Sequence, residues 1–319
     1  MSSAAVQDRP QETPPKQAKV RRRATSAMDR GVISPMEMRR PGVRIGYVLL
    51  VAILALLTMT TVYPLYWMYS GGLKSSQELI QTLPTFLPES AEWENYPEAW
   101  SNLNYRRYFT NTLVLAAGAL LFQFLVSATA AYSLSKLKPV GSSIFLFLFL
   151  STLMVPPEAY LIPQYLAVVR VPLFGFRLID TWWAVWLPRA INAFHIFILK
   201  SFFDEVPQDL MDAARIDGAK PRQVFLRILV PLSTAVLAVV AIFTVIAQWK
   251  DFFWPFLMLK SIHLQPIMVA LYRLTSQSNP EPMNIIVAGL AIASTPMIVL
   301  FLIFQRQILQ GITLTGLKG

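Results

Sequence analysis

Long apolar runs divide the chain into six segments that approach the length needed to cross a bilayer. The hydrocarbon core is about 30 Å thick and a helix rises about 1.5 Å per residue, so a span needs about 20 apolar residues. In order, the segments are Ile45 to Met68, Phe109 to Tyr132, a run starting near Ile144, Thr181 to Leu199, Leu232 to Leu257 and Asn284 to Phe304. The pattern predicts an all-α polytopic membrane protein with six transmembrane helices, because such helices satisfy their own backbone groups in lipid.

Two of the six segments contain residues that are unusual in a membrane helix. The third contains the pair Pro156-Pro157 and also Pro163, which should break or kink the helix. The fourth carries Arg189 and His195 and is the weakest by hydropathy. Ionisable groups within a membrane are costly and usually functional. We therefore also note Glu158, which we expect to face a water-filled vestibule, whereas we interpret His195 as a packing residue rather than a proton carrier.

Composition agrees with a membrane protein and excludes several kinds of chemistry. Of the 319 residues, 55% are hydrophobic and 14% charged, which lies outside the usual balance of a soluble domain. Because the chain has no Cys, disulfides, iron–sulfur clusters and Cys-ligated zinc sites are excluded. The two histidines leave little for a metal site, and we expect neither a metal nor catalytic residues. A net charge of +10 could suggest nucleic acid, but its distribution indicates membrane topology instead.

Basic residues concentrate in alternate loops. In the six-helix topology, one set of termini and loops holds 19 Lys and Arg and the other set holds 7. Since Lys and Arg are enriched on the cytoplasmic side, we predict that both termini lie inside and that the 69–108 loop, with five Glu and three bases, lies outside. Residues 1–44 are rich in Pro, Gln, Ser and charge, and we interpret them as a disordered basic cytoplasmic tail ahead of a transmembrane domain at 45–319.

The longest polar passage of the second half is a loop at about 204–231. Pro207 suits the start of a short helix that we expect to extend to Asp217, and Gly218 suits the left-handed position that ends it. Pro221 opens a second helix, and Pro231 marks the entry to the fifth span.

On the first of these two helices, Val206, Leu210 and Ala214 are spaced as an apolar stripe. Such a stripe can pack on the protein's own helices or enter the groove of a partner.

The same loop carries a motif. Its residues are Asp212-Ala213-Ala214, then Gly218 after three residues, Ile228 after nine more, and Val230-Pro231 after one more. It resembles the EAA motif of bacterial ABC importer permeases, E-A-A-x3-G-x9-I-x-L-P. Asp for Glu and Val for Leu are the two departures. Four longer stretches, at 180–188, 194–219, 242–259 and 304–319, resemble the carbohydrate-importer branch, including the maltose-type permease with a short C-terminal tail.

This resemblance implies a mechanism and a set of partners. In such importers the EAA loop is a coupling helix that sits in a cleft of a cytoplasmic ATPase subunit. The resemblance assigns this contact here to Asp212, Ala213, Ala214, Arg215, Asp217, Gly218 and Pro231. It further implies a second homologous permease, two ATPase subunits and an extracytoplasmic solute-binding protein, in the bacterial cell membrane. The chain contains no G-x4-GK[ST] phosphate loop, so we expect ATP and Mg to be bound by the ATPase subunits and no cofactor by this chain.

A sugar pathway would use aromatic faces and amide groups. Candidates cluster near the outer end of the fifth span and before the His195 segment: Asn192, Gln248, Trp249, Lys250, Asp251, Phe252 and Phe253. Aromatic residues at these positions can equally serve as lipid-facing or interfacial packing. Where the family often has W-N-D-F, this chain has Lys250. The lysine can pair with Asp251 or Glu158, or favour an anionic substrate.

Other classes of membrane protein account for less of the sequence. A secondary transporter would carry ion-coupling carboxylates in its helices, for which Glu158 is the one candidate, and often an internal repeat. A channel-type subunit without an ATPase partner fits the topology but leaves the EAA pattern unexplained. A membrane-embedded hydrolase would need a nucleophile with a base or metal ligands, and His195 alone does not supply them.

Overall fold

The computed structural model describes residues 40–81, 83, 85–102, 104–172, 174–276 and 281–316, with side chains described as far as residue 307. Every regular element in these ranges is helical. The tail expected at 1–44 lies outside the described residues up to residue 39, and residues 41–44 form the first turn of a helix. The chain divides into two compact units, Met1–Val62 and Tyr63–Gly319.

The described part of the first unit consists mostly of one apolar helix. Helix α1 (Pro41–Gly71) contains the first expected span and continues through Pro64. No residue of its apolar window is buried, and large side chains such as Leu56 and Met59 are exposed. A helix that is apolar all round and unburied by its own chain is suited to lipid or to another membrane subunit.

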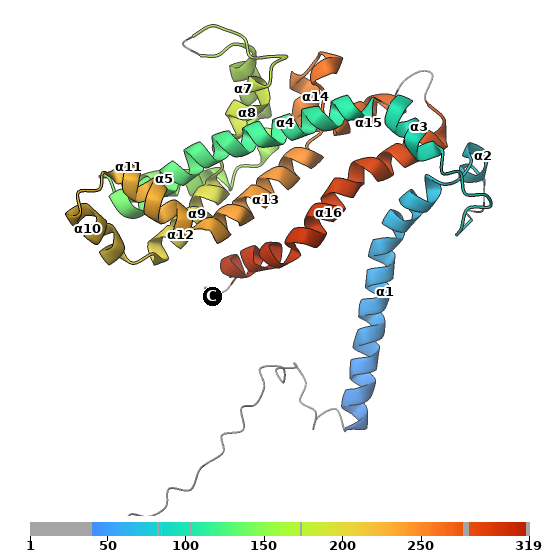
Figure 1. Cartoon of the computed structure of the whole chain (residues 1–319), viewed down its shortest axis with the longest axis horizontal. Coiled ribbons are helices and arrows are strands. Elements are labelled where there is room, and N and C mark those ends of the chain that lie inside the picture. Colours follow the sequence, from blue (N-terminus) through green and yellow to red (C-terminus); the bar gives the residue numbers. More distant parts are fainter. Residues whose placement is uncertain are drawn as a thin grey trace, which may run out of the picture. The chain divides into compact units, whose positions relative to one another are not determined.

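Three long helices form the centre of the second unit. Helix α4 (Tyr105–Gln123) continues through the π-helical turn η2 (Phe124–Ala128), α5 (Thr129–Tyr132) and a second π-helical turn, η3 (Ser133–Leu137). The other two helices are α13 (Thr234–Lys250) and α16 (Met283–Gly316). Helix α13 packs against both α4 and α16, and the three run side by side (Figure 1). These helices correspond to the second, fifth and sixth expected spans.

The remaining expected spans are broken. Helix α6 (Ser142–Thr152) and α7 (Pro157–Val169) meet at 104°, so the predicted break at Pro156-Pro157 is confirmed. No break occurs at Pro163, which lies inside α7. The fourth segment consists of α8 (Trp183–Arg189) and α9 (Ala193–Glu205). Ahead of α13, the helices α11 (Pro221–Val224), η4 (Phe225–Leu229) and α12 (Val230–Leu232) form a piece bent by 81° from it. Among the described residues, three helices are long and apolar enough to cross a membrane, or five spans if each bent pair counts as one.

Short helices cap the two ends of the second unit. Figure 1 shows α10 (Gln208–Ile216) beside α11 and α12 at one end, where α5 and α9 also finish. The other end holds α2 (Ser76–Leu79), α3 (Asn95–Asn102) and α15 (Ile267–Ser276). Helix α14 (Phe253–Met258) contacts α8 and leads through η5 (Ile262–Leu264) to α15. The buried apolar residues form three clusters: one around α5, α9 and α11–α13, a second between α3, α4, α13, α15 and α16, and a third between α4, α7, α8 and α14.

A buried polar network holds the 69–108 segment together. Lys74 Nζ lies 3.6 Å from Glu78 Oε1, and both side chains are almost fully buried. Glu78 also accepts hydrogen bonds from the Thr85 hydroxyl and, at 3.2 Å, from the Glu89 backbone N–H. Burial by itself would raise the pKa of the Glu78 carboxyl, but these two donors and the ammonium of Lys74 outweigh it and lower that pKa. The network therefore depends on an ionised Glu78.

This segment is tied to the start of α16. The Asn95 amide donates to the backbone oxygens of Gly72 and Lys74, each at 3.1 Å, and the Asn284 amide donates to Asn95 Oδ1 at 3.0 Å. Ser76 Oγ donates to Asn284 Oδ1 at 2.6 Å. Polar side chains thus fix the loop between the first two spans against the last span.

Candidate functional site

Helix α10 begins one residue after and ends one residue before the predicted bounds of Pro207 and Asp217. Pro207 occupies the position before its first residue, with an extended ψ of 133°. At the other end Gly218 has φ +83°, and the Ala219 N–H donates to the Ala214 carbonyl at 2.9 Å. Because L-residues with a side chain are strained at this φ, the left-handed position predicted for Gly218 is confirmed. The glycine ends the helix, and a Cβ added at this position would meet no heavy atom within 4 Å.

The inner face of α10 differs from the predicted stripe. Met211 is fully buried, and Ala214 packs against the same core as Val206. Leu210 points outward and is 46% exposed, so the expected stripe of Val206, Leu210 and Ala214 is wrong at its middle position. Val206 precedes the first helical residue, and a 3.6-residue period therefore does not extend to it.

The outer face of α10 offers a small, partly apolar surface. Ala213 is exposed, and Ile216 is 87% exposed. Asp212 and Arg215 form an exposed pair at 3.1 Å, and Asp217 is also exposed. Sequence reasoning passed over Ile216, although a large apolar residue directly ahead of a helix-ending glycine was visible. Exposed apolar side chains on a short amphipathic helix suit insertion into a groove of another protein.

Both ends of the loop that carries α10 are anchored to the end of the Tyr105–Leu137 helix. On the incoming side, Ser135 Oγ donates to Asp204 Oδ1 at 2.6 Å and Lys136 Nζ donates to the Val206 carbonyl at 2.7 Å. On the outgoing side, the Tyr132 hydroxyl donates to the Pro221 carbonyl at 3.2 Å. We call these three bonds the loop anchor. A displacement of α10 is therefore passed to this helix as well as along the chain.

The carboxyl of the loop anchor is ionised. Burial would raise the pKa of Asp204, but hydrogen bonds from Lys200, at 2.6 Å, and from Ser135 lower it below its ordinary value. Pro231, the last residue of the motif, lies exposed in α12, two residues before the 81° bend at Ser233. The motif thus extends from the exposed helix to the start of the fifth span.

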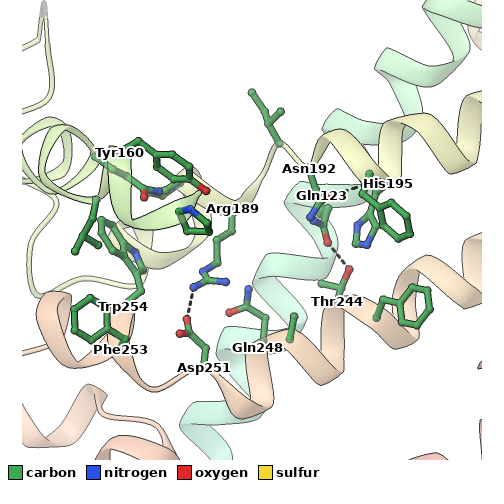
Figure 2. A pocket seen from close by; sticks show the side chains of 18 residues that line it. Gln123, Tyr160, Arg189, Asn192, His195, Thr244, Gln248, Asp251, Phe253 and Trp254 are labelled. Carbon is green, nitrogen blue, oxygen red and sulfur yellow. Dashed lines mark hydrogen bonds and ion pairs between the residues drawn. The ribbon is translucent and has the colours of Figure 1, made fainter. Parts of the chain in front are cut away.

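A cavity of about 550 Å³ lies between α7, α8, α9, α13 and α14 (Figure 2). Nine polar or charged residues line it: Gln123, Tyr160, Gln164, Arg189, Asn192, His195, Thr244, Gln248 and Asp251. Aromatic rings come from Tyr160, Phe194, Phe243, Phe253 and Trp254. The volume falls within the roughly 300–1,000 Å³ that is typical of small-molecule sites. Amides, hydroxyls and aromatic faces together are suited to a polyhydroxylated ligand.

An ion pair crosses one side of the cavity. Arg189, the last residue of α8, places a guanidinium nitrogen 2.5 Å from Asp251 Oδ2 (Figure 2). The expected pairing of Lys250 with Asp251 or Glu158 is wrong: Lys250 is exposed and makes no ion pair with the described residues. Lys250 ends α13, whereas Asp251 has left the helix with ψ 116°. The two neighbouring side chains consequently point in different directions.

Several polar atoms at the cavity are held by hydrogen bonds, and three are not; one of the three, Asp251 Oδ2, has its ion pair with Arg189. The Thr244 hydroxyl donates to Gln123 Oε1, and Asn192 Oδ1 caps α9 by accepting from the His195 N–H at 3.0 Å (Figure 2). Gln248 Oε1 and His195 Nδ1 are buried and have no hydrogen-bond partner among the described residues. An unsatisfied buried polar atom costs about 1–3 kcal/mol. A ligand that donates hydrogen bonds to these two atoms would remove that cost.

The structure brings four of the seven predicted pathway residues to the cavity: Asn192, Gln248, Asp251 and Phe253. Trp249 is only 4% exposed and donates to the Ala293 carbonyl at 3.1 Å on the opposite side of α13. Phe252 packs on Tyr272 instead, with ring centroids 4.9 Å apart. Neither these two residues nor Lys250 lines the cavity.

Sequence reasoning missed Gln123 and Thr244. Both are polar residues within apolar runs, and that isolation was the signal that could have found them. They lie 121 residues apart, however, and their pairing depends on how α13 packs against the end of α4.

Comparisons with known proteins add to this geometry. Residues 123–314 match the family described as binding-protein-dependent transport system inner membrane components. The probable ABC transporter permease protein YurM of Bacillus subtilis strain 168 is 31% identical over 259 residues, which cover 81% of this chain and 84% of YurM. The arabinooligosaccharides transport system permease protein AraQ of the same organism is 28% identical over 267 residues, which cover 83% and 93%.

A solved structure has the same fold. It is a chain from a bacterial ABC transporter involved in the import of the acidic polysaccharide alginate. Its TM-score is 0.75 at 21% sequence identity, and the match covers 84% of this chain and 98% of that chain. The long helices, the broken helices and the exposed α10 are therefore parts of a permease fold.

Proposed function

Because the chain belongs to the family of binding-protein-dependent transport system inner membrane components, we propose that it is one of two permease subunits that form the pathway for ATP-driven sugar import. It is a multi-pass protein of the cell membrane, since the family is one of inner-membrane components and several helices are long and apolar enough to span it. A second, homologous permease would supply the other half of the pathway.

The exposed outer face of α10 carries this proposal. Ala213 allows close approach of another surface, and Ile216 projects with 87% of its area exposed. Helix α10 docks in a cleft of an ATPase subunit, with Asp212, Arg215 and Asp217 as polar contacts and Gly218 ending the helix at the cleft. When two ATPase subunits close around ATP, the docked helix moves as a rigid element. The loop anchor passes that motion to the Tyr105–Leu137 helix.

The chain itself hydrolyses nothing. ATP and Mg are bound by the partner ATPase subunits, in accordance with the lack of a G-x4-GK[ST] motif in the sequence. An extracytoplasmic solute-binding protein delivers the substrate to the outer side.

The topology that serves this function has six spans with both termini inside. The pieces α8 and α9 together form the fourth span, and the bent pairs form the third and fifth. The position of α10 at the end of the second unit where α5 and α9 finish (Figure 1) supports a cytoplasmic face there, because the adjoining loops carry the excess of Lys and Arg. The 69–108 loop, with its buried network, then faces the binding protein.

The cavity is the substrate pathway through this subunit. Its amides and aromatic rings suit sugar hydroxyls and sugar faces. Named relatives agree with this class of substrate, since AraQ belongs to an arabinooligosaccharide transport system and LacG of Rhizobium radiobacter to a lactose transport system. A secondary transporter or a channel without an ATPase is not favoured, because neither accounts for the family match or for α10.

Substitution of Ala213 by Trp tests the proposal. Ala213 is exposed, so the bulky ring leaves the chain's own core intact, whereas Ala214 packs on that core. We expect Ala213→Trp to insert normally in the membrane but to lose co-purification of the ATPase and ATP-driven sugar uptake. Arg222→Trp, at an exposed position on α11, is the matched control and should retain both. Full assembly and uptake in Ala213→Trp would overturn the coupling role of α10.

A further inference from the structure

The charges at the cavity cancel. Among the described residues that line it, Arg189 is the one Arg or Lys and Asp251 the one Asp or Glu, and they contact each other at 2.5 Å. Glu158 and Lys250 are next along the chain to the lining residues Pro157 and Asp251 but do not line the cavity themselves. His195 is the remaining titratable base, and an imidazole with an ordinary pKa of about 6.5 is uncharged at about pH 8. A ligand that enters the cavity therefore meets no uncompensated charge.

The guanidinium of Arg189 is already occupied. Arginine binds carboxylates and phosphates better than any other side chain because its planar donors match their oxygens. Here Asp251 takes that place, and its side chain is only 11% exposed. An anionic ligand would have to displace the Asp251 carboxylate or lie beside it, where like charges repel. A neutral sugar hydroxyl meets neither obstacle.

The unpartnered atoms point to a ligand that carries hydroxyl groups. Gln248 Oε1 and His195 Nδ1 are buried at the cavity without a hydrogen-bond partner among the described residues. The amide oxygen is an acceptor, and so is the ring nitrogen of a neutral imidazole that carries its proton on the other nitrogen. Acceptors need donors, which sugar hydroxyls provide and ionised carboxylates or phosphates do not. This observation is independent of the ion pair.

We propose that the Arg189–Asp251 pair makes the cavity selective for uncharged polyhydroxylated ligands, with Asp251 as the residue that excludes uronates and sugar phosphates. The proposal rests on the proposed function, since it concerns the same cavity. It has a direct consequence: removing the charge of Asp251 frees Arg189, and the cavity then accepts an anionic sugar. Asp251 is thus a specificity-determining residue, and Arg189 becomes an anion site only in its absence.

The test is equilibrium binding to the purified transporter, with both permeases and the ATPases, in lipid nanodiscs at about pH 8, where an ordinary imidazole is neutral. The probes are β-1,4-mannobiose and β-1,4-dimannuronate, which differ at carbon 6 of each ring, where dimannuronate carries a carboxylate in place of the hydroxymethyl group. We expect the wild type to bind dimannuronate more weakly than mannobiose. Asp251→Asn should gain affinity for dimannuronate by about tenfold or more, as a freed guanidinium forms a charge-assisted bond.

Two further variants separate the explanations. Arg189→Gln combined with Asp251→Asn should lose the gain, because no guanidinium remains. Glu158→Gln removes one negative charge near the cavity without freeing Arg189 and should show no gain. Absence of a gain in Asp251→Asn in correctly assembled transporter, or a gain of equal size in Glu158→Gln, would overturn the proposal. Failure of the proposed function would show elsewhere, in ATPase co-purification and uptake by Ala213→Trp, which leaves the cavity untouched.

Discussion

Replacement of Gly218 measures how far coupling depends on the backbone at the end of α10. Its φ of +83° lies in the left-handed region, which costs an ordinary L-residue about 1–2 kcal/mol. A Cβ added there would meet no heavy atom within 4 Å. Steric clash inside the chain therefore adds nothing, and the backbone conformation is the whole cost. Asn tolerates this region best, and a β-branched side chain tolerates it least.

The cost acts on the last turn of α10, which positions Ile216. A change of 1–2 kcal/mol alters a conformational equilibrium by roughly five- to thirtyfold. We therefore expect ATPase binding and coupling to stay close to wild type in Gly218→Asn, to fall several-fold in Gly218→Ala and to be mostly lost in Gly218→Val. The assay is the amount of ATPase subunit that co-purifies at limiting concentration, together with sugar-stimulated ATP hydrolysis by the reconstituted transporter.

Gly175 provides a matched control. It also has a positive φ, +71°, with no heavy atom within 4 Å of an added Cβ, but it lies in the loop between α7 and α8, away from α10. Gly175→Val carries a similar backbone cost and should leave ATPase binding unchanged. If Gly218→Asn were as damaging as Gly218→Val, the size of the side chain at the partner's surface would decide the outcome and the conformational argument would fail. Unaltered coupling in Gly218→Val would refute the role of the helix end altogether.

Three further predictions follow from the contacts. Glu78→Gln should lower the free energy of unfolding by about 3–5 kcal/mol, because it leaves Lys74 charged and buried without its partner. The folded-state pKa of Glu78 is lowered, so its stabilisation is fully present above the unfolded value of about 4.3 and is lost as pH falls through the lower folded-state value. Thermal melts of the purified transporter between pH 7 and about pH 3 would show this loss. Lys136→Met should keep ATPase binding but reduce uptake per ATP hydrolysed, because it removes one bond of the loop anchor; unchanged uptake per ATP would show that the anchor is not needed. Trp249→Leu should lower thermal stability and leave sugar affinity unchanged, whereas Phe253→Ala should weaken affinity, since only Phe253 lines the cavity.

Local sequence determined the features that depend on a few neighbouring residues. The apolar runs specify long helices because lipid-facing backbone must bond within its own segment. The break between α6 and α7 follows from the missing N–H and fixed φ of Pro156-Pro157. The end of α10 follows from the left-handed conformation that only Gly218 adopts at little cost. Each of these is a property of one stretch of chain, and each is found in the structure.

The tertiary structure alone decided which side chains meet. Asp251 pairs with Arg189 from another helix rather than with the adjacent Lys250, because the chain leaves α13 between Lys250 and Asp251. Trp249 turns to α16 and leaves the cavity to Gln248, one residue earlier on the same helix. Such choices depend on the rotation and contact of whole helices. Hydrophobic periodicity does not predict how a helix is rotated about its axis when the helix is apolar on every side.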